Sequence, residues 1–390
     1  MKLSLIIDGN FLLYKDVFIL KKLRRIKQDL KELLLNDLTK LSKSFPFENI
    51  YFVSDSKEGN WRKREYKHYK GERTKDDTID WDFVYQCYSE FKDIVKSRKN
   101  VKFLEMSGLE GDDFIGHIIT ENNIKGVSNL IVASDKDIFQ KLTFDLNKKY
   151  INIQWNYKFS DERVYLPENY QLILDELSNN VNENLFELDD SSDFVKFLEN
   201  IINRTKTKTV STEESAFVKL IHGDDGDNIP SCIYTKDGKV TQSPERYGGN
   251  GDGRGIGEDG AKTLYKLFKE IHPQQIDVDS DTFLDNLTDV VIYYKKIKDT
   301  TAKQIIKDNL IFNRKMMILD TKYMPKITFE NMKNYFNEID NRVVVYESED
   351  LESKLEEDDF FNEKEMKLPE QFMMERDTEE AFDPDSFWDL

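Results

Sequence analysis

The chain has 390 residues, of which 38% are hydrophobic and 12% aromatic, so it can bury a sizeable core and is not a wholly disordered protein. Its two cysteines exclude a disulfide-rich scaffold and a cysteine-rich zinc module. No apolar run is long enough to cross a membrane, and the apolar part of the N-terminus is too short for a signal peptide. We therefore expect a cytoplasmic protein.

The 57 Lys+Arg and 75 Asp+Glu residues give a net charge of −18, which at first argues against binding a polyanion such as nucleic acid. However, residues 347–390 hold 18 acids and 4 bases, a net of −14, which leaves −4 for residues 1–346. This acidic tail is predicted to be disordered. Its apolar end suits a docking peptide for a partner's pocket, and a solubilising tail is the alternative. The docking residues would be Phe382, Phe387, Trp388 and Leu390.

The predicted elements alternate in type along the first half of the chain. Apolar runs predict strands at 2–7, 49–54, 101–104 and 129–133, and helical periodicity predicts helices at 15–42, at 81–97 and from about 111. Runs at 149–154 and 163–166 suit a hairpin or an edge pair. Alternation of strands with helices predicts a parallel α/β sheet with right-handed crossovers. From about residue 167 the pattern is mainly helical, and 234–253 is typical of a long polar loop.

Acidic residues follow each predicted parallel strand, and one more cluster lies in the helical half. Because ligands bind outside the carboxyl ends of parallel strands, these acids are expected to converge at one rim. Converging carboxylates repel unless cations neutralise them, and Mg²⁺ with oxygen ligands suits such a site. For any single acid, a helix cap or a turn residue is the more common explanation. The acids are Asp8, Asp55, Glu110, Asp112, Asp113, Asp135, Asp137, Asp224 and Asp227.

Two further segments carry the chemistry of phosphate binding. Residues 61–73 combine tryptophan and tyrosines with six Lys/Arg, so they could contact phosphates and stack a base, although a solvated helix face is the usual alternative. Gly255 and Gly257 precede a helix that contains Lys262, and backbone N–H groups at such a turn can approach phosphate. A plain loop-to-helix turn is the default for the second segment.

Taken in order, these residues resemble the motifs of the 5′-nuclease family, which includes flap endonucleases and the 5′-nuclease domain of bacterial DNA polymerase I. The phage RNase H-type 5′→3′ exonucleases are the most similar branch. The resemblance covers residues 1 to about 270. It is carried by Ile7-Asp8-Gly9-Asn10, Asp55, Trp61-Arg62, Tyr69-Lys70 with Arg73, Glu110-Gly111-Asp112-Asp113, Ser134-Asp135 with Asp137, Gly223-Asp224 with Asp227-Asn228-Ile229-Pro230, and Gly255-Ile256-Gly257.

The resemblance implies a PIN-like parallel twisted sheet flanked by helices. A helical domain with a helix–three-turn–helix motif and a disordered acidic C-terminal tail would follow. The implied catalytic domain is 1–166 with a short basic arch at 57–80. The duplex-binding domain would be 167–346, with the helix–three-turn–helix at about 212–270, and the tail 347–390. The roughly two dozen polar residues of the 231–254 insertion depart from the family pattern.

The resemblance also implies roles for single residues. The nine acids named above would hold two Mg²⁺ ions, for which Mn²⁺ can substitute, and a K⁺ ion would lie at the helix–three-turn–helix. The residues acting on the 5′ strand would be Arg62, Lys70, Arg73 and Tyr69, the last by stacking against the terminal nucleotide. Other DNA contacts would come from Lys63, Lys67, Gly255, Gly257 and Lys262.

The function so implied is a metal-dependent 5′→3′ exonuclease and flap endonuclease with RNase H-type activity. It would remove primers in phage DNA replication, in the host cytoplasm. Its partners would be duplex DNA with a 5′ flap or nick, RNA–DNA hybrids and, through the tail, a sliding clamp or a single-strand-binding protein, with no membrane. A non-catalytic DNA-junction binder or replisome adaptor on the same fold is the main alternative. An endoribonuclease is a further one, which the helical half of the chain argues against.

Overall fold

The computed structural model describes residues 2–71, 73–157, 162–180, 190–233, 235–236, 239–240, 255–274 and 276–347. The predicted docking residues Phe382, Phe387, Trp388 and Leu390, and the rest of the tail after Glu347, lie outside the described residues. Within the described part, no helix is both long enough and apolar enough to cross a membrane.

A central sheet is built from the first 210 residues. Its strands are β1 (Leu3–Asp8), β2 (Asn49–Val53), β3 (Lys102–Leu104), β4 (Ser128–Val132), β5 (Phe144–Asp145), β6 (Tyr150–Asn156), β7 (Arg163–Pro167) and β8 (Lys206–Val210). The order is β3-β2-β1-β4-β6-β7-β8, and β5 pairs with β6. The five strands from β3 to β6 in this order are parallel, whereas β7 runs antiparallel to β6 as the predicted edge pair does.

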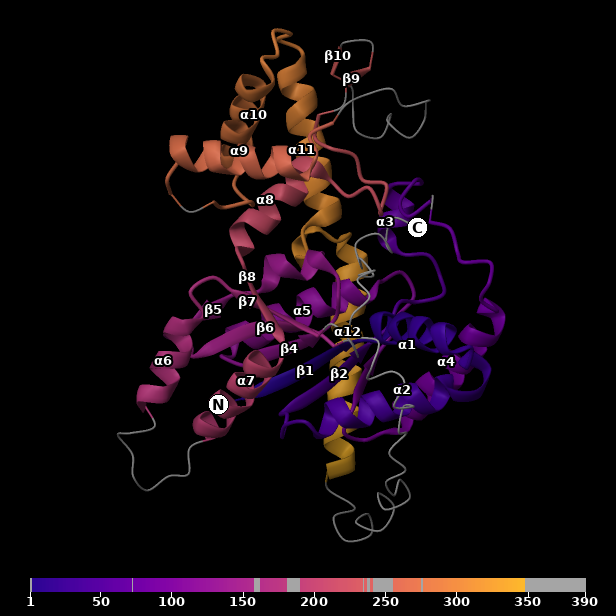
Figure 1. Ribbon diagram of the computed structural model, residues 1–390. Helices are drawn as coiled ribbons and strands as arrows, with labels where there is room; N and C mark the ends of the chain where they lie inside the picture. Colours follow the sequence, from indigo (N-terminus) through magenta and orange to yellow (C-terminus); the bar gives the residue numbers. More distant parts are fainter. Residues whose placement is uncertain are drawn as a thin grey trace.

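Helices cover both faces of this sheet because its strands are apolar on both sides. Leu5 and Ile7 of β1 belong to one core, with α1 (Gly9–Leu23), α2 (Ile26–Lys43), α4 (Trp81–Ser97) and α7 (Asp190–Arg204). Ile6 points to the other core, with α5 (Gly111–Ile124) and α12 (Lys326–Glu347). Figure 1 shows α12 running along the sheet, far in sequence from the strands it covers.

A second group of helices has its own core. It comprises α8 (Thr212–His222), α9 (Glu258–Ile271), α10 (Asp281–Lys295) and α11 (Ala302–Met317). Figure 1 shows them gathered beyond one end of the sheet. The remaining elements are α3 (Trp61–Glu65), α6 (Gln171–Asn180), β9 (Thr235–Lys236), β10 (Lys239–Val240) and the 3₁₀ helices η1 (Lys136–Lys141) and η3 (Thr321–Tyr323).

The prediction of a mostly parallel sheet flanked by helices, with further helices after it, is confirmed. Several elements depart from the expected division near residue 166. Helix α7 packs in the first core of the sheet, strand β8 pairs in parallel with β7, and α12 packs on α5 rather than on the second helical core. The sheet layer therefore includes elements of the segment that we assigned to the duplex-binding domain.

Candidate active site

The register of the sheet places three acids at one edge. Asp8 at the end of β1 lies opposite Val53 of β2, and Ile7 lies opposite Val132 of β4. Asp55 follows β2 by two residues and Asp135 follows β4 by three. Because the strands are parallel, all three side chains leave the sheet at its carboxyl edge.

Asp8 and Asp135 each cap the element that follows them with one oxygen, and Asp55 bonds in the same way to the first residue of α5. Asp8 Oδ1 accepts bonds from two N–H groups in the first turn of α1 (2.9 and 3.1 Å), Asp55 Oδ1 from the Gly111 N–H (2.7 Å) and Asp135 Oδ1 from the Asp137 N–H (2.7 Å). Among the described residues, nothing bonds to the second oxygen of Asp8, Asp55 or Asp135. Each carboxylate therefore binds backbone N–H groups with one oxygen and keeps its other oxygen free to bind a ligand.

The free acids raise one another's pKa. Burial and then the charge of Asp55 raise the pKa of Asp8 to about 7. Burial also raises the pKa of Asp55. The pKa of Asp112, in the first turn of α5, lies well above its usual range because of burial and then the charges of Asp135 and Asp8. These carboxylates therefore form one electrostatic group whose ionisation is unfavourable without a cation.

The donor set suits a hard divalent cation, because it consists of half-buried carboxylates with free oxygens. Across the part of the chain that the structure describes, no three His, Cys, Asp or Glu side chains come close enough to hold an ion as they stand. Carboxylates that already raise each other's pKa repel one another, so they do not move closer together without a cation. A bound ion would therefore be needed to bring these ligands together.

Glu110 differs from these acids because both of its oxygens are engaged. Oε1 accepts from Lys70 Nζ (2.7 Å), and Oε2 accepts from Arg62 Nη1 (3.0 Å) and the Tyr69 hydroxyl (2.9 Å). Although burial opposes ionisation, Lys70 and then Arg62 hold the pKa of Glu110 at about 2. As a metal ligand, Glu110 would first have to release these partners.

Asp113, which we expected at the metal site, also has both of its oxygens engaged by protein groups. Its Oδ2 accepts from the Trp61 indole N–H (3.2 Å) and the Glu110 N–H (3.1 Å), and its Oδ1 faces Arg62 at 2.9 Å. The side chain is fully buried. With both oxygens committed to protein groups, Asp113 positions Arg62 and the start of α5.

The basic segment at 61–73 is not a solvated helix face. Trp61, Arg62, Tyr66 and Tyr69 are all buried. Because the Tyr69 ring is only 3% exposed and its hydroxyl is bound to Glu110, the expected stacking on a nucleotide does not fit this arrangement. Two expected DNA contacts on the segment, Lys63 and Lys67, are exposed, and Lys63 Nζ donates to the Tyr69 carbonyl (2.8 Å).

The second acid cluster lies beside the first and is also paired with cations. Asp227 forms an ion pair with Arg73 and lies 3.9 Å from Lys70 Nζ. Lys219 in the last turn of α8 bridges Asp137 and Asp224, with Nζ 2.6 Å from Asp224 Oδ2. Burial raises the pKa of Asp137 to about 7 against the pull of Lys219. In Asp224, Lys219 outweighs burial and lowers the pKa.

With all nine carboxylates ionised, nine negative charges stand against four paired cations of the described residues, an excess of five. The cations are Arg62, Lys70, Arg73 and Lys219. Two divalent ions would balance most of this excess.

Sequence reasoning missed Lys219. Its position three residues before His222, at the end of a helix that leads into the Asp224 cluster, was the available signal.

The expected duplex-binding turn is described in part. Gly255 is needed for close packing, since a Cβ there would lie 2.8 Å from the Cβ of Ser231, whereas a Cβ at Gly257 would meet nothing within 4 Å. Ser231 Oγ donates to the Ile221 carbonyl (2.9 Å) and accepts from the Ile256 N–H (2.9 Å), which ties the turn to α8. Much of the insertion, including residues 241–254, lies outside the described residues.

Lys262 lies in the first turns of α9 and pairs with Glu258 on the surface.

Helix α11 bonds to the backbone or side chains next to both acid clusters, and nothing in the sequence indicates these contacts. Buried Asn313 donates to the carbonyls of Leu220 (2.9 Å) and Pro230 (3.0 Å), which flank the loop of Asp224 and Asp227. The Met316 carbonyl at the end of α11 accepts from Arg62 Nε (2.9 Å). The helical region therefore contributes directly to the position of site residues.

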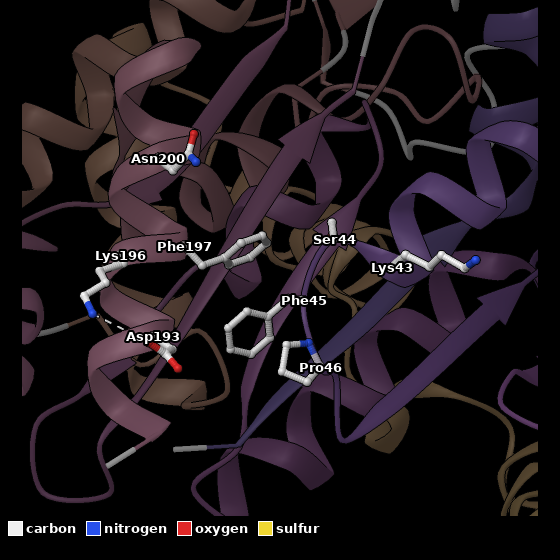
Figure 2. Close-up of a pocket in the computed structure, with 8 residues that line it drawn as sticks. All are labelled: Lys43, Ser44, Phe45, Pro46, Asp193, Lys196, Phe197 and Asn200. Carbon is white, nitrogen blue, oxygen red and sulfur yellow. Dashed lines mark ion pairs between the residues drawn. The ribbon is translucent and has the colours of Figure 1, made fainter. Parts of the chain in front are cut away.

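A surface hollow of about 600 Å³ lies elsewhere, between the segment after α2 and α7. Figure 2 shows Phe45, Pro46 and Phe197 in it, flanked by Lys43 and Lys196. None of the candidate site residues lines this hollow. The acids instead lie along the carboxyl edge of the sheet and the neighbouring loops.

The family model and the two relatives that match this chain are all 5′-3′ exonucleases. Residues 3–167 match the family model described as "5′-3′ exonuclease, N-terminal resolvase-like domain". A 5′-3′ exonuclease of Buchnera aphidicola subsp. Schizaphis graminum is 27% identical over 164 residues, 41% of this chain and 55% of that protein, so the chain matches about half the length of this relative. A 5′-3′ exonuclease of Mycoplasmopsis pulmonis is 23% identical over 367 residues, 91% of this chain and 96% of that protein.

Among solved structures, bacteriophage T5 5′-exonuclease with bound zinc has a TM-score of 0.49 at 15% identity, covering 87% of this chain and 99% of that one. A T5 flap endonuclease in a pseudo-enzyme–product complex with DNA and metal ions has a TM-score of 0.49 at 14% identity, with the same coverage. Residues 3–167 therefore carry a match to the 5′-3′ exonuclease N-terminal domain, and the chain is similar to 5′-3′ exonucleases over 41% to 91% of its length.

Proposed function

We propose that this protein is a divalent-metal-dependent 5′→3′ exonuclease and flap endonuclease that hydrolyses phosphodiesters at the 5′ ends or flaps of DNA and of RNA–DNA hybrids. Primer removal during phage DNA replication is the role that this activity would serve. One observation carries the proposal. Asp8, Asp55 and Asp135 each keep an oxygen free at one edge of the sheet, beside a second acid loop and the paired cations Arg62, Lys70 and Lys219.

The residues that would hold two Mg²⁺ ions are those with free or releasable oxygens. Asp8, Asp55, Asp112 and Asp135 would form the first group, together with Glu110 once its partners leave. The second group would be Asp137, Asp224 and Asp227. Divalent cations bound there would neutralise charge on the scissile phosphate and favour in-line attack by water.

The cations of this site would bind the phosphates of the substrate. Lys70 and Arg62 hold Glu110, and Arg73 holds Asp227. If an ion takes over these carboxylates, the freed ammonium and guanidinium groups can bind the phosphates of the 5′ strand, since a phosphate presents the same oxygen chemistry. Asp113 keeps Arg62 in place during this exchange, because neither of its own oxygens is needed elsewhere.

Duplex beyond the cleavage point would lie against the turn at Gly255 and Gly257 and against Lys262, with K⁺ as a further bound ion there. The phosphate contacts are supported by the backbone N–H groups at the start of α9 and by the positive end of its dipole. The K⁺ ion is proposed from the family resemblance alone.

The test is cleavage mapping on 5′-labelled flap, nicked and RNA–DNA hybrid substrates over a Mg²⁺ titration. We expect cleavage near the 5′ end or flap junction that requires the divalent ion and also proceeds with Mn²⁺. A protein that binds these substrates but leaves all of them uncut at every metal concentration would be the junction binder instead.

For the tail, we propose that Phe382, Phe387, Trp388 and Leu390 dock on a partner such as a sliding clamp or a single-strand-binding protein. The support is the combination of apolar residues with acidic neighbours in the sequence. Deleting residues 378–390 should lower cleavage on templates loaded with that partner and leave cleavage of bare oligonucleotides intact. Equal cleavage of both by the truncated protein would contradict this.

A further inference from the structure

A basic and aromatic patch lies at the C-terminal end of helix α10, outside the motifs that resemble the 5′-nuclease family. It consists of Tyr293, Lys295, Lys296 and Lys298. All four side chains are exposed, Tyr293 to 72%. Among the described residues, none of them has an ion pair, hydrogen bond or ring contact through its side chain. Such a large unpartnered aromatic side chain with three unpaired lysines is unusual on a chain of net negative charge.

Nearby acids do not neutralise these lysines. Asp289, one turn before Tyr293, pairs with Lys303 (2.5 Å). Asp299, directly after the patch, accepts from the N–H (2.9 Å) and hydroxyl (2.7 Å) of Thr301. The positive charge of the patch is therefore available to an anionic partner.

The backbone under the patch is fixed. Lys296 adopts the left-handed conformation (φ 53°) that ends α10, and its N–H bonds to the Tyr293 carbonyl (3.2 Å). The Ile297 N–H bonds to the Ile292 carbonyl (3.1 Å), and both isoleucines pack against the second helical core. The lysines thus project from a rigid helix end, so binding through them would cost little backbone entropy.

Tyr294, the neighbour of two patch residues, places the end of α10 near the start of α9. A Cβ built on Gly260, in the first turn of α9, would lie 3.9 Å from the Tyr294 hydroxyl. Lys295 lies near Cys232, where burial raises the pKa of the thiol to about 12 and the lysine charge opposes this rise. The end of α10 therefore lies close to the start of α9.

We propose that the patch Tyr293–Lys298 is a second contact for the sugar–phosphate backbone of duplex DNA, next to the glycine turn of α9. Three lysines and a tyrosine hydroxyl are donors typical of phosphate contacts, and phosphate contacts are independent of sequence. Favourable interaction of lysines with the helix C-terminus is the simpler explanation for Lys295. It does not account for Lys298, which lies beyond the helix, nor for the exposed ring of Tyr293.

This inference rests on the proposed function, since it assigns a further part of the same duplex to the protein. Each phosphate contact contributes about 0.9 to the slope of log K against log salt concentration on duplex DNA. Three lysine contacts should therefore contribute roughly 2–3 units of slope.

The experiment compares the triple variant K295Q/K296Q/K298Q with the wild-type full chain. Binding of a fluorescent duplex in EDTA is followed by anisotropy over a series of salt concentrations. The matched control is K148Q/K149Q, because Lys148 and Lys149 are exposed at the turn before β6, at the opposite edge of the sheet. Tyr293→Phe reports on the hydroxyl alone, and thermal unfolding confirms that each variant is folded.

We expect the triple variant to bind duplex about tenfold or more weakly at low salt, with a slope shallower by roughly 2–3, while the control keeps both values. On cleavable duplex with Mg²⁺, KM should rise with kcat unchanged. A slope equal to that of the wild type, or an equal loss on a single strand of the same length, would overturn the inference and leave the proposed function standing. Failure of the wild type itself to bind or cut would refute the proposed function and this inference with it.

Discussion

Lys219 links the two acid clusters, so its replacement by methionine perturbs the site in a defined way. Methionine has a similar length and no charge. In the folded protein Lys219 pairs with Asp137 and Asp224, and its side chain is only 18% exposed. The variant K219M therefore leaves two largely buried carboxylates next to each other without their cation.

Removing one partner of a buried ion pair costs about 3–5 kcal/mol. Because Lys219 keeps some contact with solvent and Asp137 can take up a proton, we expect a cost below this range, about 2–3 kcal/mol at pH 8. An unfolding entropy of about 2.1 cal/mol/K per residue, over 390 residues, converts this into a fall in Tm of roughly 3 °C. At pH 5 the loss should be smaller, because Asp137, with a pKa of about 7, is then protonated and no longer repels Asp224.

The assay is thermal unfolding in EDTA at pH 5 and pH 8. Lys262→Met is the matched control, since Lys262 pairs with Glu258 at a site where its side chain is 44% exposed, and it should cost at most about 0.5 kcal/mol. If both variants lost the same stability, or if the loss for K219M were the same at both pH values, the account of Lys219 as a bridge between buried acids would be refuted.

Three further predictions concern the stability of variants at Asp113, at the glycine turn before α9 and at Asp16. Asp113→Asn should lower the free energy of unfolding by about 2–3 kcal/mol through the lost partner of Arg62, yet leave divalent-ion affinity by calorimetry unchanged; a large loss of affinity would return it to the metal site. Gly255→Ala should cost about 1–3 kcal/mol in chemical denaturation and Gly257→Ala less than about 0.5, because only the first creates a clash; equal costs would contradict this. Burial raises the pKa of Asp16 from 3.8 to about 7, so ionisation of Asp16 lowers the stability of the wild type as pH rises from about 4 to 7. The free energy of unfolding of Asp16→Asn should therefore rise by at least about 1 kcal/mol relative to that of the wild type over this pH range. A difference between the two free energies that stays constant with pH would refute the shift.

The sequence predicted best what depends on local pattern. An acid after each parallel strand has to emerge at one edge once the strands are parallel, and Asp8, Asp55 and Asp135 do so. The single helix expected at 15–42 is in fact two, because Arg24 takes the left-handed conformation and ends α1. Nothing in the residue types there marks the break, since neither glycine nor proline is present.

What the sequence could not reveal are pairings between distant segments. The bond from Arg62 to the Met316 carbonyl spans 254 residues, and that from Gln140 to the Met317 carbonyl spans 177. Such contacts hold Arg62 where it forms an ion pair with Asp113. Tyr69 is buried for a similar reason, because it packs in one small cluster with Met316 and Met317.

We propose that the free carboxylates at the edge of the sheet hold the divalent ions that cleavage requires. The most direct measurement is the cleavage rate of a 5′-labelled flap duplex over a Mg²⁺ titration, for the wild type and Asp135→Asn, with binding of the same duplex measured in EDTA. The account predicts cleavage by the wild type only with the ion, and a loss of about 10²-fold or more in the variant while binding stays within about threefold. Full turnover by Asp135→Asn, or cleavage by the wild type in EDTA, would contradict it.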